Sequence, residues 1–349
     1  MTNKYIGYWL LLGVIMIFIQ IFIGGVTRLT GSGLSITKWE IVTGSIPPIN
    51  EEQWISEFEL YKDTPQYKMI NEGMELKDFK FIYFWEYFHR LWARIMGLVF
   101  LIPFIYFLIK GKLNKLLKKR LIIVLLLAAL VASFGWIMVA SGLIERPWVN
   151  AYKLAAHLSL AVVTLIYLFW VYLKEFATSK TTVSKSFLLG LIIPIGVLLL
   201  VQLFLGGIMS GVKAALVYPT WPNLHGEFLP SILIEKQNWI ISNFINYDEG
   251  IFFSALIQFL HRMNGYLIFI LGVLFLVSIF KNKAYVNLRF KSLLWFLVLL
   301  IQIFLGITVL INSIGVIPVG IGVLHQVVGV LLIFIFSSIY FSVSLKNAN

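Results

Sequence analysis

The sequence predicts an all-α integral membrane protein with eight transmembrane helices, arranged as two repeated four-helix bundles. Three observations lead to this fold class: eight long apolar runs, an uneven distribution of basic residues, and motifs that recur in the same order. Of the 349 residues, 60% are hydrophobic and only 13% are charged. A soluble domain of this length needs more charge to cover its surface.

The eight apolar runs are each long enough to cross the roughly 30 Å core of a bilayer as an α-helix. Closed β-barrels can also span a membrane, but barrel strands alternate in polarity and these runs are continuous. The first run follows a short leader and lacks the cleavage pattern of a signal peptide, so we expect it to remain as a helix. The expected spans are 8–26, 83–109, 121–140, 152–173, 187–209, 252–280, 292–312 and 320–345.

The net charge of +12 is explained by topology. An even number of spans puts both termini on one side, where fifteen basic residues face one acid, Glu175, whereas the other side has ten basic and fourteen acidic residues. The positive-inside rule then places both termini in the cytoplasm, with the chain in the cell (inner) membrane among its lipids. We expect no nucleic-acid partner. The fifteen basic residues are Lys4, Lys110, Lys112, Lys115, Lys118, Lys119, Arg120, Lys174, Lys180, Lys185, Lys281, Lys283, Arg289, Lys291 and Lys346.

Two outer segments, at about 27–82 and 210–251, are long and contain Pro, Trp and acidic residues. Residues 51–63 within the first segment fit a short amphipathic helix lying at the membrane interface. A solvated helix fits the same residues equally well.

The chain repeats itself. QIFIGG at 20–25 recurs as QLFLGG at 202–207, and the two copies are 182 residues apart. His89 and His261, each followed by Arg, are 172 apart, and His157 and His325 are 168 apart. Three landmarks in the same order predict a duplication with parallel repeats, because each half has an even number of spans. The expected halves are residues 1–180 and 181–349.

Four of the five histidines lie in the expected spans, at 89, 157, 261 and 325. They occupy spans two, four, six and eight, and each lies within about three turns of the outer end. Ionisable residues are costly inside a membrane and are usually functional there. We therefore expect one layer of histidines in the outer half of the membrane, two in each repeat. His225 lies in the second outer segment without a counterpart, and we expect it to be a surface residue.

These histidines favour haem over other metal groups. Cysteine is absent, which excludes disulfides, thiolate haem ligands, iron–sulfur clusters and Cys-rich zinc sites. A zinc or copper site normally has a third or fourth protein ligand. Two facing histidines in an apolar four-helix bundle fit a bis-His haem. Arg90 and Arg262 directly follow two of the histidines and are candidate partners for haem propionates, or else snorkel to the interface.

The two halves differ at one chemically important position. Glu86 stands three residues before His89 and is the only acid in any expected span, whereas Gln258 stands before His261. A residue at this spacing shares a helix face with the histidine. Glu86 is therefore a candidate catalytic group for proton transfer, with pairing to Arg90 at i+4 as the alternative. The difference predicts one reaction site and one simpler redox site.

Taken together, five segments resemble haem A synthase: GGVTRLTGSGLSITKWEIVTGSIPP at 24–48, EYFHR at 86–90, NAYKLAAHLSLA at 150–161, FLHRMNGY at 259–266 and LHQVVGV at 324–330. The resemblance runs from Gly24 to past His325, and its first block is very specific. It is closest to the proteobacterial and mitochondrial branch, whose outer loops lack the cysteine pair of other bacterial members.

The resemblance implies an enzyme, a haem-dependent oxidoreductase that oxidises the C8 methyl group of haem O to a formyl group. The product, haem A, serves cytochrome oxidase. By similarity, His89 and His157 would hold the haem O substrate, and His261 and His325 would hold a haem b cofactor that passes electrons. The implied partners are a haem O synthase and oxidase assembly factors, with a homo-oligomer as a further expectation. His225 matches no ligand of the family.

Two other functions are compatible with parts of this pattern. A di-haem b-type electron-transfer cytochrome would have the same ligand layout, but it does not explain Glu86, and it would leave no haem near the inner face. A secondary transporter would need broken helices at the midplane, for which Pro103 and Pro194 are the only signals.

Overall fold

The computed structural model describes residues 4–37, 46–143, 146–176 and 186–344. Four sequence-based expectations lie outside these residues: part of the 24–48 block, the basic residues Lys180, Lys185 and Lys346, the boundary at 180/181, and the structure of either terminus. Within the described residues all regular structure is helical, apart from one isolated bridge between Leu224 and Glu227.

Eight of the described helices are long and apolar enough to cross a membrane, as the sequence predicts. Each of the eight expected runs coincides with one of them, although several helices extend beyond the runs. They are α1 (Lys4–Leu29), α4 (Leu76–Ile109), α5 (Lys115–Ala140), α6 (Ala151–Phe176), α7 (Ser186–Gly211), α9 (Phe252–Lys281), α10 (Arg289–Ile311) and α11 (Val319–Ser344). A helix of 26 residues, such as α1, is about 39 Å long, enough to cross the bilayer core. The chain is therefore a multi-pass membrane protein.

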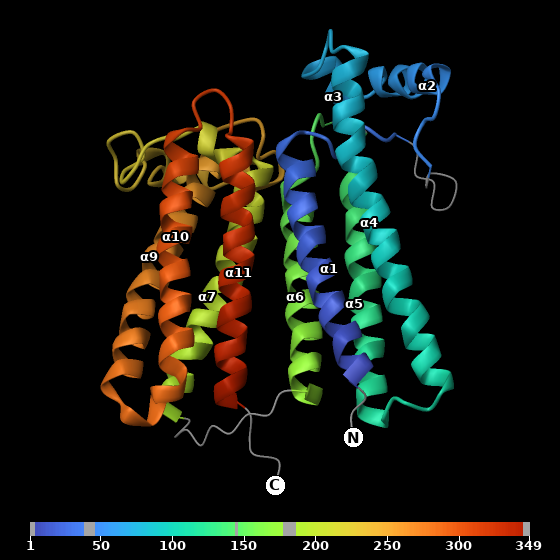
Figure 1. Cartoon of the computed structure of the whole chain (residues 1–349). Coiled ribbons are helices and arrows are strands. Elements are labelled where there is room, and N and C mark those ends of the chain that lie inside the picture. The colour runs from blue at the N-terminus through green and yellow to red at the C-terminus, as the bar shows by residue number, and fades with distance from the viewer. Residues whose placement is uncertain (1–3, 38–45, 144–145, 177–185, 345–349) are drawn as a thin grey trace. The chain divides into compact units, whose positions relative to one another are not determined.

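The chain folds as two compact units, Met1–Phe176 and Ala177–Asn349, here called unit 1 and unit 2. In unit 1, α1 packs against α4 and α6, and α5 packs against α6. In unit 2, α7 packs against α9 and α11, and α10 packs against α9 and α11. The long helices of each unit run alongside one another (Figure 1). The duplication itself remains an interpretation of the sequence.

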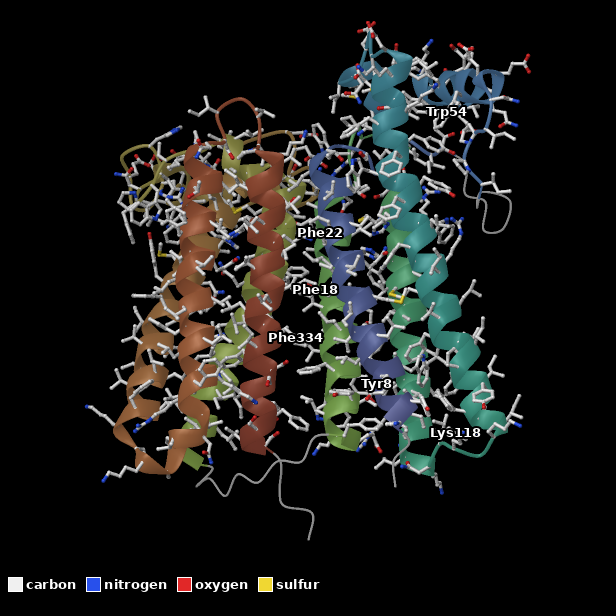
Figure 2. The ribbon with its side chains drawn as sticks, in the orientation of Figure 1. Tyr8, Phe18, Phe22, Trp54, Lys118 and Phe334 are labelled. Carbon is white, nitrogen blue, oxygen red and sulfur yellow. The ribbon has the colours of Figure 1, made fainter. Side chains whose placement is uncertain are left out.

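The connection between α1 and α4 in unit 1 contains two short helices, α2 (Glu51–Lys62) and α3 (Pro65–Met69). The helix expected at 51–63 is therefore present, and Asn50 caps it by accepting a hydrogen bond from the backbone N–H of Gln53. Phe58 and Tyr61 pack on the extended first turns of α4, around Phe79. Burial in this cluster raises the pKa of Tyr61 to about 12. Figure 2 shows Trp54 of α2 beside the upper part of α4.

The second outer segment is made of short pieces rather than long helices. They are η2 (Ala214–Leu216), η3 (Ser231–Leu233), η4 (Lys236–Asn238) and α8 (Ser242–Ile245). Leu233 packs against Phe252, Ala255 and Leu256 at the start of α9. This contact fixes the segment against the first turns of α9.

Candidate functional site

Each of the four membrane histidines lies against a glycine on the preceding long helix. A Cβ built on Gly24 of α1 would stand 3.2 Å from Nε2 of His89, and a Cβ on Gly206 of α7 would stand 3.3 Å from Cε1 of His261. The other two contacts are closer still, at 2.9 Å between Gly135 and Cε1 of His157 and 2.8 Å between Gly306 and Cε1 of His325. A side chain at any of these glycines would fill the space that its imidazole occupies.

In three of the four cases, a glutamine one helical turn before the glycine also contacts the histidine. Gln20 donates to the backbone carbonyl of His89 at 3.1 Å. Gln202 donates to the carbonyl of His261 at 3.0 Å, and its amide nitrogen also lies 3.1 Å from Nε2 of that ring. The amide nitrogen of Gln302 lies 3.4 Å from Nε2 of His325. In the fourth case Val131 takes the place of glutamine, and its carbonyl lies 3.0 Å from Nδ1 of His157.

These supporting residues were missed in the sequence, although a signal for them is present. The spacing of four between Gln and Gly occurs at 20 and 24, at 202 and 206, and again at 302 and 306. Residues four apart share a face of a helix, so the third copy could have revealed the pattern. In each copy the Gln and the Gly lie on the helix surface that contacts the histidine of the following long helix.

The donor set of each unit suits haem iron better than a bare metal ion. His89 and His157 are close enough for a charge on one imidazole to act on the other, and the same holds for His261 and His325. Among the described residues no group of three or more His, Cys, Asp or Glu could hold a metal ion. A porphyrin supplies four nitrogens itself and needs only two axial ligands from the protein, so two imidazoles are sufficient.

The free ring nitrogens agree with this donor set. The contact from Nδ1 of His157 to the carbonyl of Val131 makes Nδ1 the donor, so Nε2 keeps its lone pair for a metal. Nδ1 of His261 is buried without a hydrogen-bond partner among the described residues. A buried, unpartnered nitrogen of this kind is costly unless a ligand uses the site. The histidine pairs therefore fit haem as axial ligands.

Glu86 is buried and its carboxylate accepts four hydrogen bonds. Oε2 accepts from the backbone N–H and the hydroxyl of Ser35, both at 2.7 Å, and from the backbone N–H of Ile36 at 2.9 Å. Oε1 accepts from the guanidinium of Arg90 at 2.6 Å. The i+4 pairing with Arg90 is thus present, and the carboxylate also binds the turn that follows α1.

In unit 2 the residue that matches Glu86 is Gln258. Gln258 donates a hydrogen bond to the second outer segment, whereas Glu86 accepts hydrogen bonds from the turn after α1. Gln258 donates to the carbonyl of Ala214 at 2.8 Å and accepts from Arg262 at 2.6 Å. Arg262 also donates to the carbonyls of Asn223 at 3.0 Å and Thr220 at 2.7 Å. Among the residues that the structure describes, Arg90 therefore has a carboxylate beside it and Arg262 does not. A charge of +1 remains at Arg262, whereas the pair in unit 1 is neutral when Glu86 is ionised.

His225 is exposed, as expected for a surface residue. Its backbone has a positive φ of 51°, and its ring lies 5.0 Å from the ring of Tyr218. These contacts place it in the turn of the second outer segment. His225 belongs to neither pair of membrane histidines.

Comparisons with known proteins identify the family of the chain. Residues 7–337 match the model of a family described as cytochrome oxidase assembly protein. A haem A synthase of Flavobacterium psychrophilum is 39% identical, over 95% of this chain and 96% of the relative. A haem A synthase of Flavobacterium johnsoniae is 38% identical over 95% of each chain, and one of Bradyrhizobium diazoefficiens is 38% identical over 93% of this chain and 87% of its own.

Proposed function

The chain belongs to the family of cytochrome oxidase assembly proteins, and from this membership we propose that it is itself a haem A synthase. Its similarity to named haem A synthases extends over nearly the whole chain. The proposed reaction is the oxidation of the C8 methyl group of haem O to a formyl group. The product is haem A for cytochrome oxidase, and the enzyme is an oxidoreductase acting on a CH group.

The observation that carries this proposal is the presence of two separate imidazole pairs, each supported by glycines of the neighbouring helices. A di-haem electron carrier would have the same two pairs, so the difference between the units at Glu86 and Gln258 is what favours a reacting haem in one of them. Two pairs provide one site for a haem that reacts and another for a haem that stays. A haem bound in the second site supplies an iron that exchanges single electrons.

We assign the substrate haem O to His89 and His157, and the cofactor haem b to His261 and His325. The assignment rests on the chemical difference between the units. Unit 1 has a carboxylate at Glu86, three residues from His89, whereas unit 2 has the neutral Gln258. Methyl oxidation must dispose of protons in a site shielded from water, and a carboxylate can accept them.

Glu86 is the proposed proton-handling group. Its carboxylate is the acceptor in all four of its hydrogen bonds. A proton arriving on either oxygen would displace a donor from Ser35, Ile36 or Arg90. Proton uptake would therefore be accompanied by a small movement of the turn after α1.

The two arginines are the proposed partners of haem propionates. Arg90 and Arg262 each lie one residue after a ligand histidine and direct their guanidinium groups toward the outer segment of their unit. Guanidinium groups bind carboxylates strongly and in a fixed geometry. A haem held in this way would have its propionates near Arg90 or Arg262.

We propose that the chain lies in the cell (inner) membrane with both termini in the cytoplasm. A haem O synthase must supply the substrate, and cytochrome oxidase assembly factors are the proposed receivers of haem A. The apolar substrate and the surrounding lipids both favour transfer of haem O to this chain, and of haem A from it, within the membrane.

Extraction of the haems from the purified protein tests the proposal. A haem A synthase should yield prenylated haem O or haem A together with haem B. A di-haem b-type cytochrome would yield haem B alone, and a transporter would yield no haem. Haem B alone from protein made in cells that contain haem O would overturn the proposal.

A further inference from the structure

The two units differ in how their second and third long helices pack. In unit 2, α9 and α10 are a packed pair, but the corresponding α4 and α5 of unit 1 are not. Figure 1 shows α4 diverging from α5 toward the end where residues 110–114 connect them. We call the boundary between α4 and α5 the seam of unit 1, and the boundary between α9 and α10 the seam of unit 2.

Aromatic side chains close the matching seam of unit 2. Phe275 and Trp295 meet edge to face with ring centroids 5.8 Å apart, and both are fully buried. Phe269 and Phe296 stack with centroids 6.1 Å apart. A Cβ built on Gly272 would stand 3.1 Å from Leu299, so α9 and α10 approach closely there. Aromatic pairs of this kind stabilise the packing by more than the burial of their surface area alone.

Unit 1 has none of these side chains at the matching positions. Counted from the histidines, Phe269 and Phe275 of α9 correspond to Gly97 and Pro103 of α4. Counted from Gly135 and Gly306, which are 171 residues apart, the α10 residues Trp295, Phe296 and Leu299 correspond to Val124, Leu125 and Ala128 of α5.

The smaller side chains leave the seam of unit 1 open. Ala128 is exposed whereas Leu299 at the matching position is buried, and a Cβ on Gly97 would meet no atom within 4 Å. Phe100 occupies the position of Gly272, but its ring packs on Trp9 of α1 at 4.9 Å rather than closing the seam. Proline within a helix also removes a backbone hydrogen bond and favours a bend, as at Pro103.

The seam of unit 1 lies on the inner side of its histidine pair. Gly97 lies eight residues beyond His89 toward the inner end, and Ala128 lies seven residues before Gly135, which supports His157. At 1.5 Å per residue these offsets place the seam about 11 Å from the imidazoles. Because Arg90 is held at the outer end by Glu86, the apolar edge of a bound macrocycle would point toward the seam.

We infer that unit 1 opens sideways to the lipid between α4 and α5, and that this opening takes the long apolar chain of a prenylated haem substrate. The closed α9–α10 seam retains the haem of unit 2. This inference rests on the proposed function, because the occupant is its substrate. The opening allows a bulky membrane-borne haem to enter and its product to leave without crossing the outer segment.

Giving unit 1 the side chains of unit 2 tests the inference. The full-length variant Gly97→Phe/Ala128→Leu is expressed in membranes that contain haem O, and haem A is measured per bound haem B. We expect this ratio to fall about tenfold, the order by which added bulk excludes a ligand from an apolar site. Haem B itself should stay at the parent amount. Ala128→Leu alone is a milder variant that should lower the ratio in the same direction.

Leu130→Phe is the matched control. Leu130 is exposed, and so is Ile301 at the matching position of α10, although α10 is packed against α9. At about 100° per residue, Leu130 also lies about 200° around α5 from Ala128, so it faces away from the seam. Added bulk there should leave the ratio unchanged. A parent-level ratio in both seam variants, with haem B retained, would overturn the lateral opening. If the parent protein itself makes no haem A from haem O, the proposed function fails first.

The reverse change in unit 2 provides an independent test. Phe269→Gly/Leu299→Ala should open the α9–α10 seam, and bound haem B should then exchange with added isotope-labelled haem about tenfold faster than in the parent. An unchanged exchange rate in a variant that still binds haem B would show that this seam does not retain the cofactor.

Discussion

The imidazole of His325 lies directly against Gly306 of the neighbouring helix, so that a Cβ on Gly306 would stand 2.8 Å from its Cε1 carbon. No real Cβ contact is this short, so a side chain at Gly306 would have to displace the ring. His157 and Gly135 repeat the relationship at 2.9 Å. The orientation of these histidines therefore depends on the absence of a single methyl group on the adjacent helix.

Gly306→Ala should disturb the haem of unit 2 without removing its ligand. Displacement of the His325 ring should cost about 1–3 kcal/mol of stability, as overpacking does elsewhere. The low-spin haem b spectrum should change in shape or fall in intensity. The visible spectrum and the thermal midpoint of the purified variant are the measurements.

Gly320→Ala on α11 is the control for this substitution, because a Cβ there would meet nothing within 4 Å. Alanine is favoured over glycine inside a helix by roughly 0.5–1 kcal/mol, so this variant should be as stable as the parent or slightly more so. A Gly306→Ala protein with the spectrum and midpoint of the parent would contradict the packing described here.

The helices could be predicted from the sequence because long apolar runs determine them almost alone. The expected runs at 152–173 and 252–280 lie within or closely match α6 and α9. The helix at 51–63 was also predictable, because Trp54, Phe58 and Tyr61 recur at the spacing of one helix face among charged residues. In each case the determining signal is local.

The surroundings of the histidines could not be predicted in the same way. Which face of α10 meets His325 depends on how two helices rotate against each other, and that rotation is set by packing over their whole length. The contact between Glu86 and Ser35 joins residues 51 apart. It depends on how the chain turns after α1, for which no periodic pattern exists.

Glu86→Gln should depress haem A formation while leaving haem binding largely intact. General acid–base groups typically contribute about 10²–10⁴ in rate, so the loss should lie in that range. The measurement is haem A per bound haem B in membranes. The glutamine also reproduces the residue that unit 2 carries at Gln258.

The structural contribution of Glu86 is measured separately, through Ser35→Ala. This variant removes the hydroxyl donor at 2.7 Å from the carboxylate but leaves the carboxylate itself in place. It should loosen the turn at 32–36, seen as faster hydrogen exchange, with a ratio of haem A to haem B close to that of the parent. If Glu86→Gln also kept the parent ratio, the catalytic role would be excluded and Glu86 would remain a partner of Arg90.

Reporter fusions test the orientation in the membrane. Figure 2 shows Lys118 and Trp54 at opposite ends of unit 1. The positive-inside rule places the end with Lys118 in the cytoplasm. A reporter fused after Lys115 should therefore report a cytoplasmic position, and one inserted at Asn71, after α3, should report the outside. The opposite result at both sites would reverse the topology and place the histidine layer in the inner half of the membrane.

The central claim is that each histidine pair holds a different haem, and the haem content of paired variants measures this directly. Two full-length proteins are compared with the parent after extraction and chromatography of their haems: His89→Ala/His157→Ala and His261→Ala/His325→Ala. The first should lose prenylated haem and keep haem B with its low-spin spectrum, because an axial nitrogen fixes the spin state of the iron. The second should lose haem B and its spectrum. If both variants lost the same haem, or if the second kept its low-spin haem B unchanged, the assignment of the two sites would be wrong.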